Sequence, residues 1–373
     1  MKLKLSNIYI FYAAFILMEI LICFANSSVE PLELQYISYF CIALFGIKII
    51  TTRYSVKEIL IMSVVLGICA YSTAVNGDSR VMWFALAICA MKNVKFKDIV
   101  EISFFTMLSC VVVFIILFAF GFTKGVFIGE DKGTRISLGL GHPNMFSEYY
   151  NLLLLHLVFL WFDKIKPMHI IWSFFGAIAI YLYSKSVTGI MVYMALLLAV
   201  VIYKYKIFEK IKIREIFPYI IIAGIIAFTV LPIIYDSNNG VMVKLDSFFT
   251  GRFSQANYYF QKYGINLFGS DVSFDLNTEW VHAILDIGYT RMLIYNGIFY
   301  YLLVVIPLVV SMILAEKKKK YPLLIMLVVM CVYMYTENVA TYVFMNVSML
   351  YFSSYIFKTS GEKVCVRRRK YVR

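Results

Sequence analysis

The sequence predicts an all-α protein of the polytopic membrane class, a single bundle of about twelve membrane-spanning helices. Hydrophobic residues make up 62% of the 373 positions and charged residues only 15%, an apolar fraction above that of ordinary soluble domains. Apolar runs of roughly 20 residues, the length needed to cross a bilayer, recur along the chain. One long interval, residues 236–283, lacks such runs. We therefore expect one integral membrane domain over residues 1–373, with a large extracytoplasmic loop at 236–283.

The expected membrane spans follow one another with short connections. The first is too long for the apolar core of a signal peptide and lacks a convincing cleavage site, so we expect it to be retained. A soluble all-helical protein is the disfavoured alternative, because it would have to bury nearly every helix on all faces. The expected spans are residues 7–25, 36–50, 58–75, 80–91, 99–121, 144–162, 168–183, 187–203, 219–235, 284–314, 321–336 and 338–357.

The distribution of Lys and Arg predicts the orientation. Most of the 35 basic residues fall in one set of connections, together with both termini, and the positive-inside rule makes this set cytoplasmic. The net charge of +13 therefore does not imply nucleic acid. The even number of spans places the remaining cations outside, where topology gives no reason for them. These cations are Arg80, Lys124, Lys132, Arg135, Lys185, Lys244, Arg252, Lys262 and Arg291.

The cysteines and acidic residues predict no metal site. The seven cysteines are scattered, mostly inside expected spans, and form no C-x-x-C pair, so we interpret them as small apolar residues. The sequence has no acidic cluster of the kind a divalent cation requires. We expect the protein to need no metal or other cofactor.

An expected outer segment ends in the sequence R-I-S-L-G-L-G-H-P-N over residues 135–144. Its glycines allow the backbone to approach a ligand closely, and Pro143 suits the first turn of the next helix. Arg135 beside a helix start is a candidate site for a phosphate-bearing group. His142 and Asn144 are expected to orient substrate or hold the loop. An ordinary re-entry loop is an equally weighted interpretation.

Two further outer segments carry candidate residues. The tight turn around Lys185 brings a cation to the membrane boundary, where it contacts a ligand or simply extends to the interface. In the long loop, Arg252 precedes a predicted amphipathic helix that runs through Tyr263, and Asp286 and Arg291 stand at the mouth of the next span. We predict that Arg135, Arg252 and Asp286 approach one outer cavity.

The order of these motifs is similar to that of a known family. R-x-S-L-G-x-x-H-P-N, an S/T-G turn, G-R-x-x-x-A, Y-G-I-x-L-F-G and D-x-x-Y…G follow one another. This order resembles the Wzy-type repeat-unit polymerases, which belong with the O-antigen polymerases and ligases. Val187 stands where the family's S-R-T-G turn often has Arg, so Lys185 is displaced from that role. Asp286 stands near the position where the ligase branch has His, which favours a polymerase.

The resemblance implies a GT-C-like membrane glycosyltransferase in the bacterial cytoplasmic membrane. Its substrates would be glycans linked to undecaprenyl diphosphate, joined at the outer face into O-antigen, capsule or exopolysaccharide. Its other partners would be the bilayer, a flippase and a chain-length regulator, with no nucleic acid.

The candidate residues take separate roles in such a reaction. Arg135 and Arg252, with Arg291 third, would hold the leaving diphosphate, because guanidinium binds two phosphate oxygens. Asp286, and next His282, are the candidate bases for the acceptor hydroxyl. The alternatives are a lipid-linked oligosaccharide flippase, an O-antigen-ligase-type transferase and a structural scaffold. A flippase would carry charges along a central path inside the spans.

Overall fold

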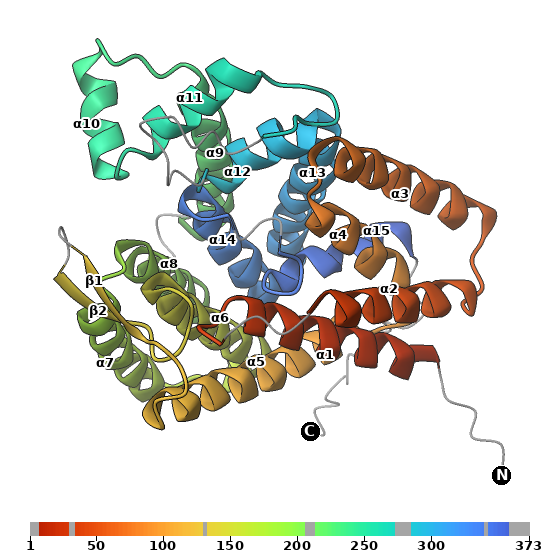
Figure 1. Cartoon of the computed structure of the whole chain (residues 1–373), viewed down its shortest axis with the longest axis horizontal. Helices are drawn as coiled ribbons and strands as arrows, with labels where there is room; N and C mark the ends of the chain where they lie inside the picture. The colour runs from red at the N-terminus through yellow and green to blue at the C-terminus, as the bar shows by residue number, and fades with distance from the viewer. Residues whose placement is uncertain are drawn as a thin grey trace, which may run out of the picture.

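The chain forms a helical bundle in the computed structural model, which describes residues 7–29, 34–129, 133–205, 213–272, 285–338 and 342–357 (Figure 1). Within these residues, eight helical segments are long and apolar enough to cross a membrane. They are α1 (Asn7–Ala25), α3 (Val56–Asn76), α5 (Phe96–Ala119), α6 (Pro143–Trp161), α7 (Pro167–Ser184), α8 (Val187–Lys204), α9 (Ile213–Ile233) and a segment containing α12 (Gly288–Arg291) and α13 (Gly297–Lys317). The architecture is that of a multi-pass membrane protein.

Shorter apolar helices complete the bundle. They are α2 (Leu34–Ile50), α4 (Ser79–Ala90), α14 (Tyr321–Thr336) and a last segment made of the 3-10 helix Val347–Phe352 and α15 (Ser353–Ile356). Every residue of α14 from Leu323 to Thr336 is buried, as expected for a helix that is hydrophobic on all sides. It packs against α6, α8, α9 and α13 and lies near the middle of the bundle in Figure 1.

The expectation of about twelve spans therefore exceeds what helix length supports. The 12 residues of α4 extend about 18 Å, short of the roughly 30 Å hydrocarbon layer. The expected span 338–357 is wrong over its described part: the chain turns at Tyr342 and forms only short helices. Val343, Phe344 and Leu350 are buried, so this apolar run fills the core. From the sequence alone, a short apolar run that crosses the membrane cannot be distinguished from one that is buried in the core.

A small β-hairpin departs from the all-α expectation. Strands β1 (Val126–Gly129) and β2 (Gly133–Ile136) pair antiparallel, with Phe127 opposite Arg135. Backbone bonds fix its base, because Ser137 N donates to Gly125 O at 2.8 Å and Gly141 N to Asn26 O at 2.8 Å. β2 packs against α7, and the hairpin lies beside that helix in Figure 1. The outer segment, for which an ordinary re-entry loop was one of two equally weighted interpretations, thus contains a hairpin tied to the end of α1.

The long loop after α9 forms two helices, α10 (Gly240–Phe248) and α11 (Arg252–Tyr263), and the predicted helix through Tyr263 is confirmed. The returning chain then docks on the next segment. Ile298 N donates to Asn266 O at 3.0 Å and Phe299 N to Leu267 O at 3.1 Å.

That docking site interrupts the span expected at 284–314. A π-helix, Met292–Asn296, precedes Gly297, whose φ is +87°, so α12 and α13 are not one continuous helix. A Cβ on Gly269 would lie 1.9 Å from Tyr295 O, and a Cβ on Gly297 would lie 2.3 Å from Gly269 N. Only glycine allows the two backbones to approach this closely.

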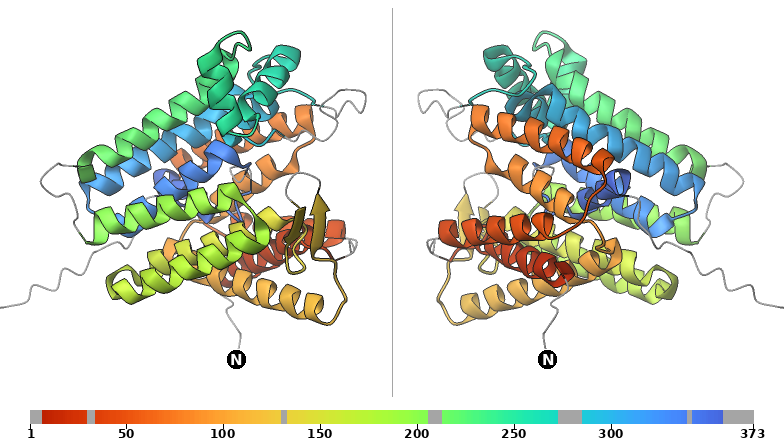
Figure 2. Two further views of the ribbon diagram at one scale, coloured as in Figure 1. Left: turned by 90° about the vertical axis from the view of Figure 1, so that its left-hand side faces the viewer. Right: turned by 90° about the vertical axis from the view of Figure 1, so that its right-hand side faces the viewer.

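The described segments that connect the helices lie at two opposite ends of the bundle. The hairpin end contains β1, β2, the α7–α8 turn, α10 and α11. The opposite end, called here the basic end, contains Lys48, which donates to Lys92 O at 3.0 Å, and Lys204, which donates to Phe162 O at 2.7 Å. In the left view of Figure 2 the hairpin lies toward the right and the C-terminal end of α8 toward the left. Lys48 and Lys204, both assigned to the cytoplasmic set by charge, thus lie away from the hairpin.

Candidate functional site

Arg252 occupies a shared position between three elements at the hairpin end. Its Nε lies 3.4 Å from Asp286 Oδ2 and its Nη2 lies 3.1 Å from Glu337 Oε1. Its Nη1 lies 3.3 Å from Thr188 Oγ1 at the start of α8. The Arg252 side chain is only 13% exposed. These contacts bring the end of α14, the start of α8 and the segment before α12 to one guanidinium, which we call the Arg252 cluster.

The local sequence explains how Arg252 reaches this position. Gly251, with a φ of +77°, turns the chain into α11. Asp246 of α10 accepts hydrogen bonds from Phe253 N at 2.7 Å and Ser254 N at 3.1 Å. A carboxylate on the first N–H groups of a helix satisfies donors that would otherwise be unpaired. The cap on α11 therefore fixes the helix start that carries Arg252.

The two carboxylates of the Arg252 cluster have raised pKa values. Burial raises the pKa of Glu337 to about 7, against the lowering effect of Arg252 and with a further rise from Asp286. Burial also raises the pKa of Asp286, again against Arg252 and, more weakly, Arg291. Desolvation thus outweighs ion pairing at both groups. A carboxyl group that titrates near neutrality is suited to proton transfer.

A third carboxylate lies below this pair. Glu148, in the first turns of α6, is buried with 4% exposure and is close enough to Glu337 for electrostatic repulsion. Its burial places the Glu148 carboxyl group inside the bundle. Glu337 therefore has Asp286 on one side and Glu148 on the other, and the ionisation of each of these carboxyl groups influences that of Glu337.

Arg135 lies on β2 and contacts the same turn between α7 and α8. Its Nε donates to Ser184 O at 2.7 Å and its Nη2 to Asn144 Oδ1 at 2.7 Å. Burial lowers the pKa of Arg135, which remains a cation. His142 is the N-cap of α6 and accepts from Asn144 N at 3.2 Å. His142 and Asn144 therefore help to hold the loop at the start of α6, one of the two roles expected for them.

The α7–α8 turn separates Arg135 from Arg252 by a short distance. Arg135 contacts Ser184 and Arg252 contacts Thr188, and four residues extend at most about 14 Å. The two guanidinium groups therefore lie within roughly 20 Å of each other. A lipid diphosphate together with one or two sugars can bridge a distance of this order. Gly189 is required in this turn because its Cβ would lie 2.3 Å from Ser147 Cβ.

Lys185 lies against the hairpin, and Arg291 lies against Tyr295. Lys185, at a φ of +50°, has its Nζ 3.6 Å from the position of a Cβ on Gly133, so its side chain lies along the hairpin. Arg291 is 6% exposed and stacks 4.4 Å over the ring of Tyr295. Among the described residues, Arg291 has no carboxylate partner within ion-pair distance.

Arg291 instead lies near a second charged group at the hairpin end. Arg80 binds Asp78 through two bonds, from Nε at 2.6 Å and from Nη2 at 2.8 Å, and donates to Tyr342 OH at 2.7 Å. The sequence identified Arg80 as an informative outer cation and gave it no role. The structure accounts for it as an ion pair that joins the start of α4 to Tyr342.

His282, the second candidate base, lies outside the described residues. Glu337 and Thr188 were not predicted as site residues, although both contact Arg252. One signal was available for Glu337: it directly follows the apolar run 321–336, and an ionisable residue at a membrane boundary is a functional candidate. Thr188 had no such signal beyond its place in the S/T-G turn.

A scan against protein-family models and searches of the curated proteins and of the solved structures found no match. The Arg252 cluster and the neighbouring Arg135 are therefore interpreted from their own geometry and from the order of the motifs in the sequence.

Proposed function

We propose that this chain is a membrane glycosyltransferase of the Wzy type, which joins undecaprenyl-diphosphate-linked oligosaccharide repeat units at the outer face of the cytoplasmic membrane. The observation that carries the proposal is the Arg252 cluster: one guanidinium between two carboxylates of raised pKa, with a second guanidinium on the adjacent turn. The proposed orientation, with both termini in the cytoplasm, places this cluster outside.

The reaction breaks the bond between the anomeric carbon of the growing glycan and the diphosphate oxygen. A new bond then joins that carbon to an acceptor hydroxyl of the incoming repeat unit. Negative charge develops on the departing diphosphate, and preorganised cations stabilise it most effectively in a site with little water. Arg252 and Arg135, both partly buried, are suited to bind its oxygens.

The acceptor hydroxyl must lose its proton as the new bond forms. Glu337 and Asp286 are the described carboxylates in contact with Arg252, so either can accept that proton within the same site. Binding of the diphosphate would neutralise much of the positive charge of Arg252. Because Arg252 lowers the pKa of both carboxyl groups, this neutralisation makes them stronger bases when the donor is bound.

The proposal is tested with Arg252→Ala and Arg252→Lys in a strain that depends on this chain for polymer. Both variants should insert normally and fail to elongate, since loss of one preorganised contact typically lowers the rate about 10²–10³-fold and lysine lacks the two-pronged geometry. Lys262→Ala, an exposed cation at the other end of α11, is the matched control and should leave polymer length unchanged.

The lipid-linked intermediates separate the alternatives. A polymerase defect leaves single lipid-linked repeats at the outer face, whereas a flippase defect leaves them at the inner face. A ligase-type transferase would leave full-length lipid-linked polymer that is not transferred. Accumulation at the inner face, or normal polymer in Arg252→Ala, would overturn the proposal.

A further inference from the structure

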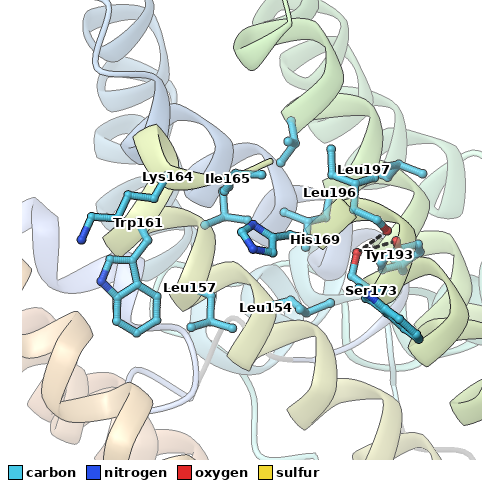
Figure 3. A pocket seen from close by; sticks show the side chains of 14 residues that line it. Leu154, Leu157, Trp161, Lys164, Ile165, His169, Ser173, Tyr193, Leu196 and Leu197 are labelled. Atoms are coloured by element: carbon cyan, nitrogen blue, oxygen red, sulfur yellow. Dashed lines mark hydrogen bonds between the residues drawn. The ribbon is translucent and has the colours of Figure 1, made fainter. Parts of the chain in front are cut away.

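A large apolar groove opens between α6, α7 and α8, toward the basic end and away from the Arg252 cluster (Figure 3). Its volume is about 780 Å³. Leucine, valine, isoleucine and tryptophan side chains form most of its wall. The polar pair inside it is satisfied, because Ser173 Oγ and Tyr193 OH are hydrogen-bonded to each other at 2.9 Å. The interior of the groove therefore suits an apolar ligand.

The groove lies beside α7, which is mostly exposed at the edge of the described bundle. Of its residues only Ala177 and Ser184 are buried. Near the hairpin end α7 is held to α6 by the hydrogen-bonded hydroxyls of Ser147 and Ser184, 2.9 Å apart, and by Tyr150 OH, which donates to Ser173 O at 2.7 Å. The groove begins at Ser173 and continues toward the α6–α7 connection.

The end of the groove near the α6–α7 connection is basic. Lys164 and His169 are the lining residues that can carry positive charge, and both are labelled in Figure 3. His169 Nδ1 accepts from Lys166 N at 3.1 Å, so Nε2 carries the proton of the neutral ring and is a donor. Lys204 lies close by, since it donates to the backbone O of Asp163 at 2.9 Å. This end of the groove therefore has three lysines, Lys164, Lys166 and Lys204, and one histidine, but only one carboxylate, that of Asp163. Such an excess of basic groups favours the binding of an anionic group.

We infer that this groove binds an anionic glycerophospholipid, with one acyl chain along α6, α7 and α8 and the phosphate at Lys164 and His169. The inference is independent of the proposed function. A volume of about 780 Å³ lies in the range of ligand sites for small molecules, roughly 300–1,000 Å³. Exposed Trp161 and Trp172 at its margin are typical of residues at the boundary between headgroups and hydrocarbon.

The shape of the groove favours a lipid chain over a helix of a partner protein. A helix about 10 Å across occupies on the order of 400 Å³ per turn, so the groove would hold fewer than two turns. Its lining nevertheless extends along α6 from Leu154 to Lys164, nearly three helical turns by the same geometry. A space that is long and narrow matches an extended hydrocarbon chain with a charged end.

The tryptophans provide a direct probe, because bromine atoms on a nearby acyl chain quench their fluorescence. The purified full chain is placed in phosphatidylcholine vesicles containing increasing fractions of brominated phosphatidylglycerol or, separately, brominated phosphatidylcholine. We expect saturable quenching at a several-fold lower fraction of the anionic lipid. The difference should disappear in a Trp161→Phe, Trp172→Phe double variant.

Two pairs of variants assign the site. Lys164→Gln with His169→Gln should raise the required fraction of anionic lipid roughly fivefold or more, the effect of about one removed surface charge, while exposed Lys57→Gln should have no effect. Leu197→Phe, which narrows the groove by enlarging one side chain of its lining, should weaken selective quenching, while Leu198→Phe, on exposed surface outside the lining, should preserve it.

Equal quenching by the two brominated lipids would mean only unselective lipid contact and would overturn the inference. Selective quenching that survives both Leu197→Phe and the charge variants would place the lipid elsewhere and would overturn it as well. If the charge variants fold poorly, the Leu197 and Leu198 pair, which keeps every charge, decides the question.

Discussion

Replacing Glu337 by glutamine should remove a pH dependence of both stability and activity. Burial raises the pKa of this carboxyl from its ordinary value of 4.5 to about 7, so folding favours its protonated form. The stabilising contribution is therefore fully present below pH 4.5 and is lost as the pH rises through 7. Between pH 5 and pH 8 the loss is about 2–3 kcal/mol, because each pH unit of the difference corresponds to about 1.4 kcal/mol.

Glutamine has nearly the same shape and does not ionise, so Glu337→Gln should lack this loss. The apparent melting temperature of the purified protein in detergent should fall by several degrees from pH 5 to pH 8 in the wild type, and by clearly less in the variant. An equal decrease in both proteins would refute the pKa assigned to Glu337. Glu101→Gln, which removes an exposed carboxyl group on α5, is the control and should keep the decrease between pH 5 and pH 8.

Activity provides the second measurement on the same variant. If Glu337 accepts the proton, the wild-type elongation rate should rise about tenfold from pH 6 to pH 8, following the ionised fraction of a group with a pKa near 7. Glu337→Gln should be slower by about 10²–10⁴-fold and should lose that rise. A slow variant that retains the rise would make Asp286 the base and would limit Glu337 to positioning Arg252.

The remaining predictions concern the loop, its cap and the topology. Gly297→Ala should prevent the 264–269 segment from docking and should raise protease cleavage within the α9–α12 loop. Gly46→Ala, whose added Cβ meets no atom within 4 Å, should leave that cleavage unchanged. Equal protection of both variants from the protease would contradict the close packing at Gly297. Asp246→Asn should weaken the cap on α11 by about 1 kcal/mol and reduce activity more than it reduces expression. Unchanged activity would show that the cap is not needed to position Arg252. In a variant without Cys365, a cysteine at Asn238 should react with an impermeant reagent added to intact cells while one at Lys317 should not; the reverse result would invert the proposed orientation.

Much of the fold was predictable because apolar run length reports helices directly. Residues 7–25 were expected as a span, and α1 covers Asn7–Ala25. Residues 187–203 were expected as another, and α8 covers Val187–Lys204. Composition does not distinguish a run that faces lipid from one that fills the core, which is why 338–357 was assigned wrongly and why α4 was expected to cross. The hairpin was missed because its two strands have only four residues each.

The site was predictable only in part, because convergence is a tertiary property. Arg252 and Asp286 were selected as charged residues of matched motifs, one in the long loop and one at the mouth of the next span, and they lie in contact. Glu337 comes from a different part of the chain, 85 positions after Arg252, and no local pattern linked the two. Lys185 was selected by its charge, but the left-handed backbone of the turn directs it to the hairpin. Ion pairs across elements depend on how the helices pack, which periodicity alone does not specify.

The most direct test of the central claim uses the purified chain in vesicles, supplied with single lipid-linked repeat units extracted from a strain that lacks it. The proposed function predicts a ladder of longer lipid-linked glycans, with one undecaprenyl diphosphate released for each repeat added, and no ladder with Arg252→Ala. Movement of the repeat units across the bilayer without any increase in length would contradict it and would identify a transporter.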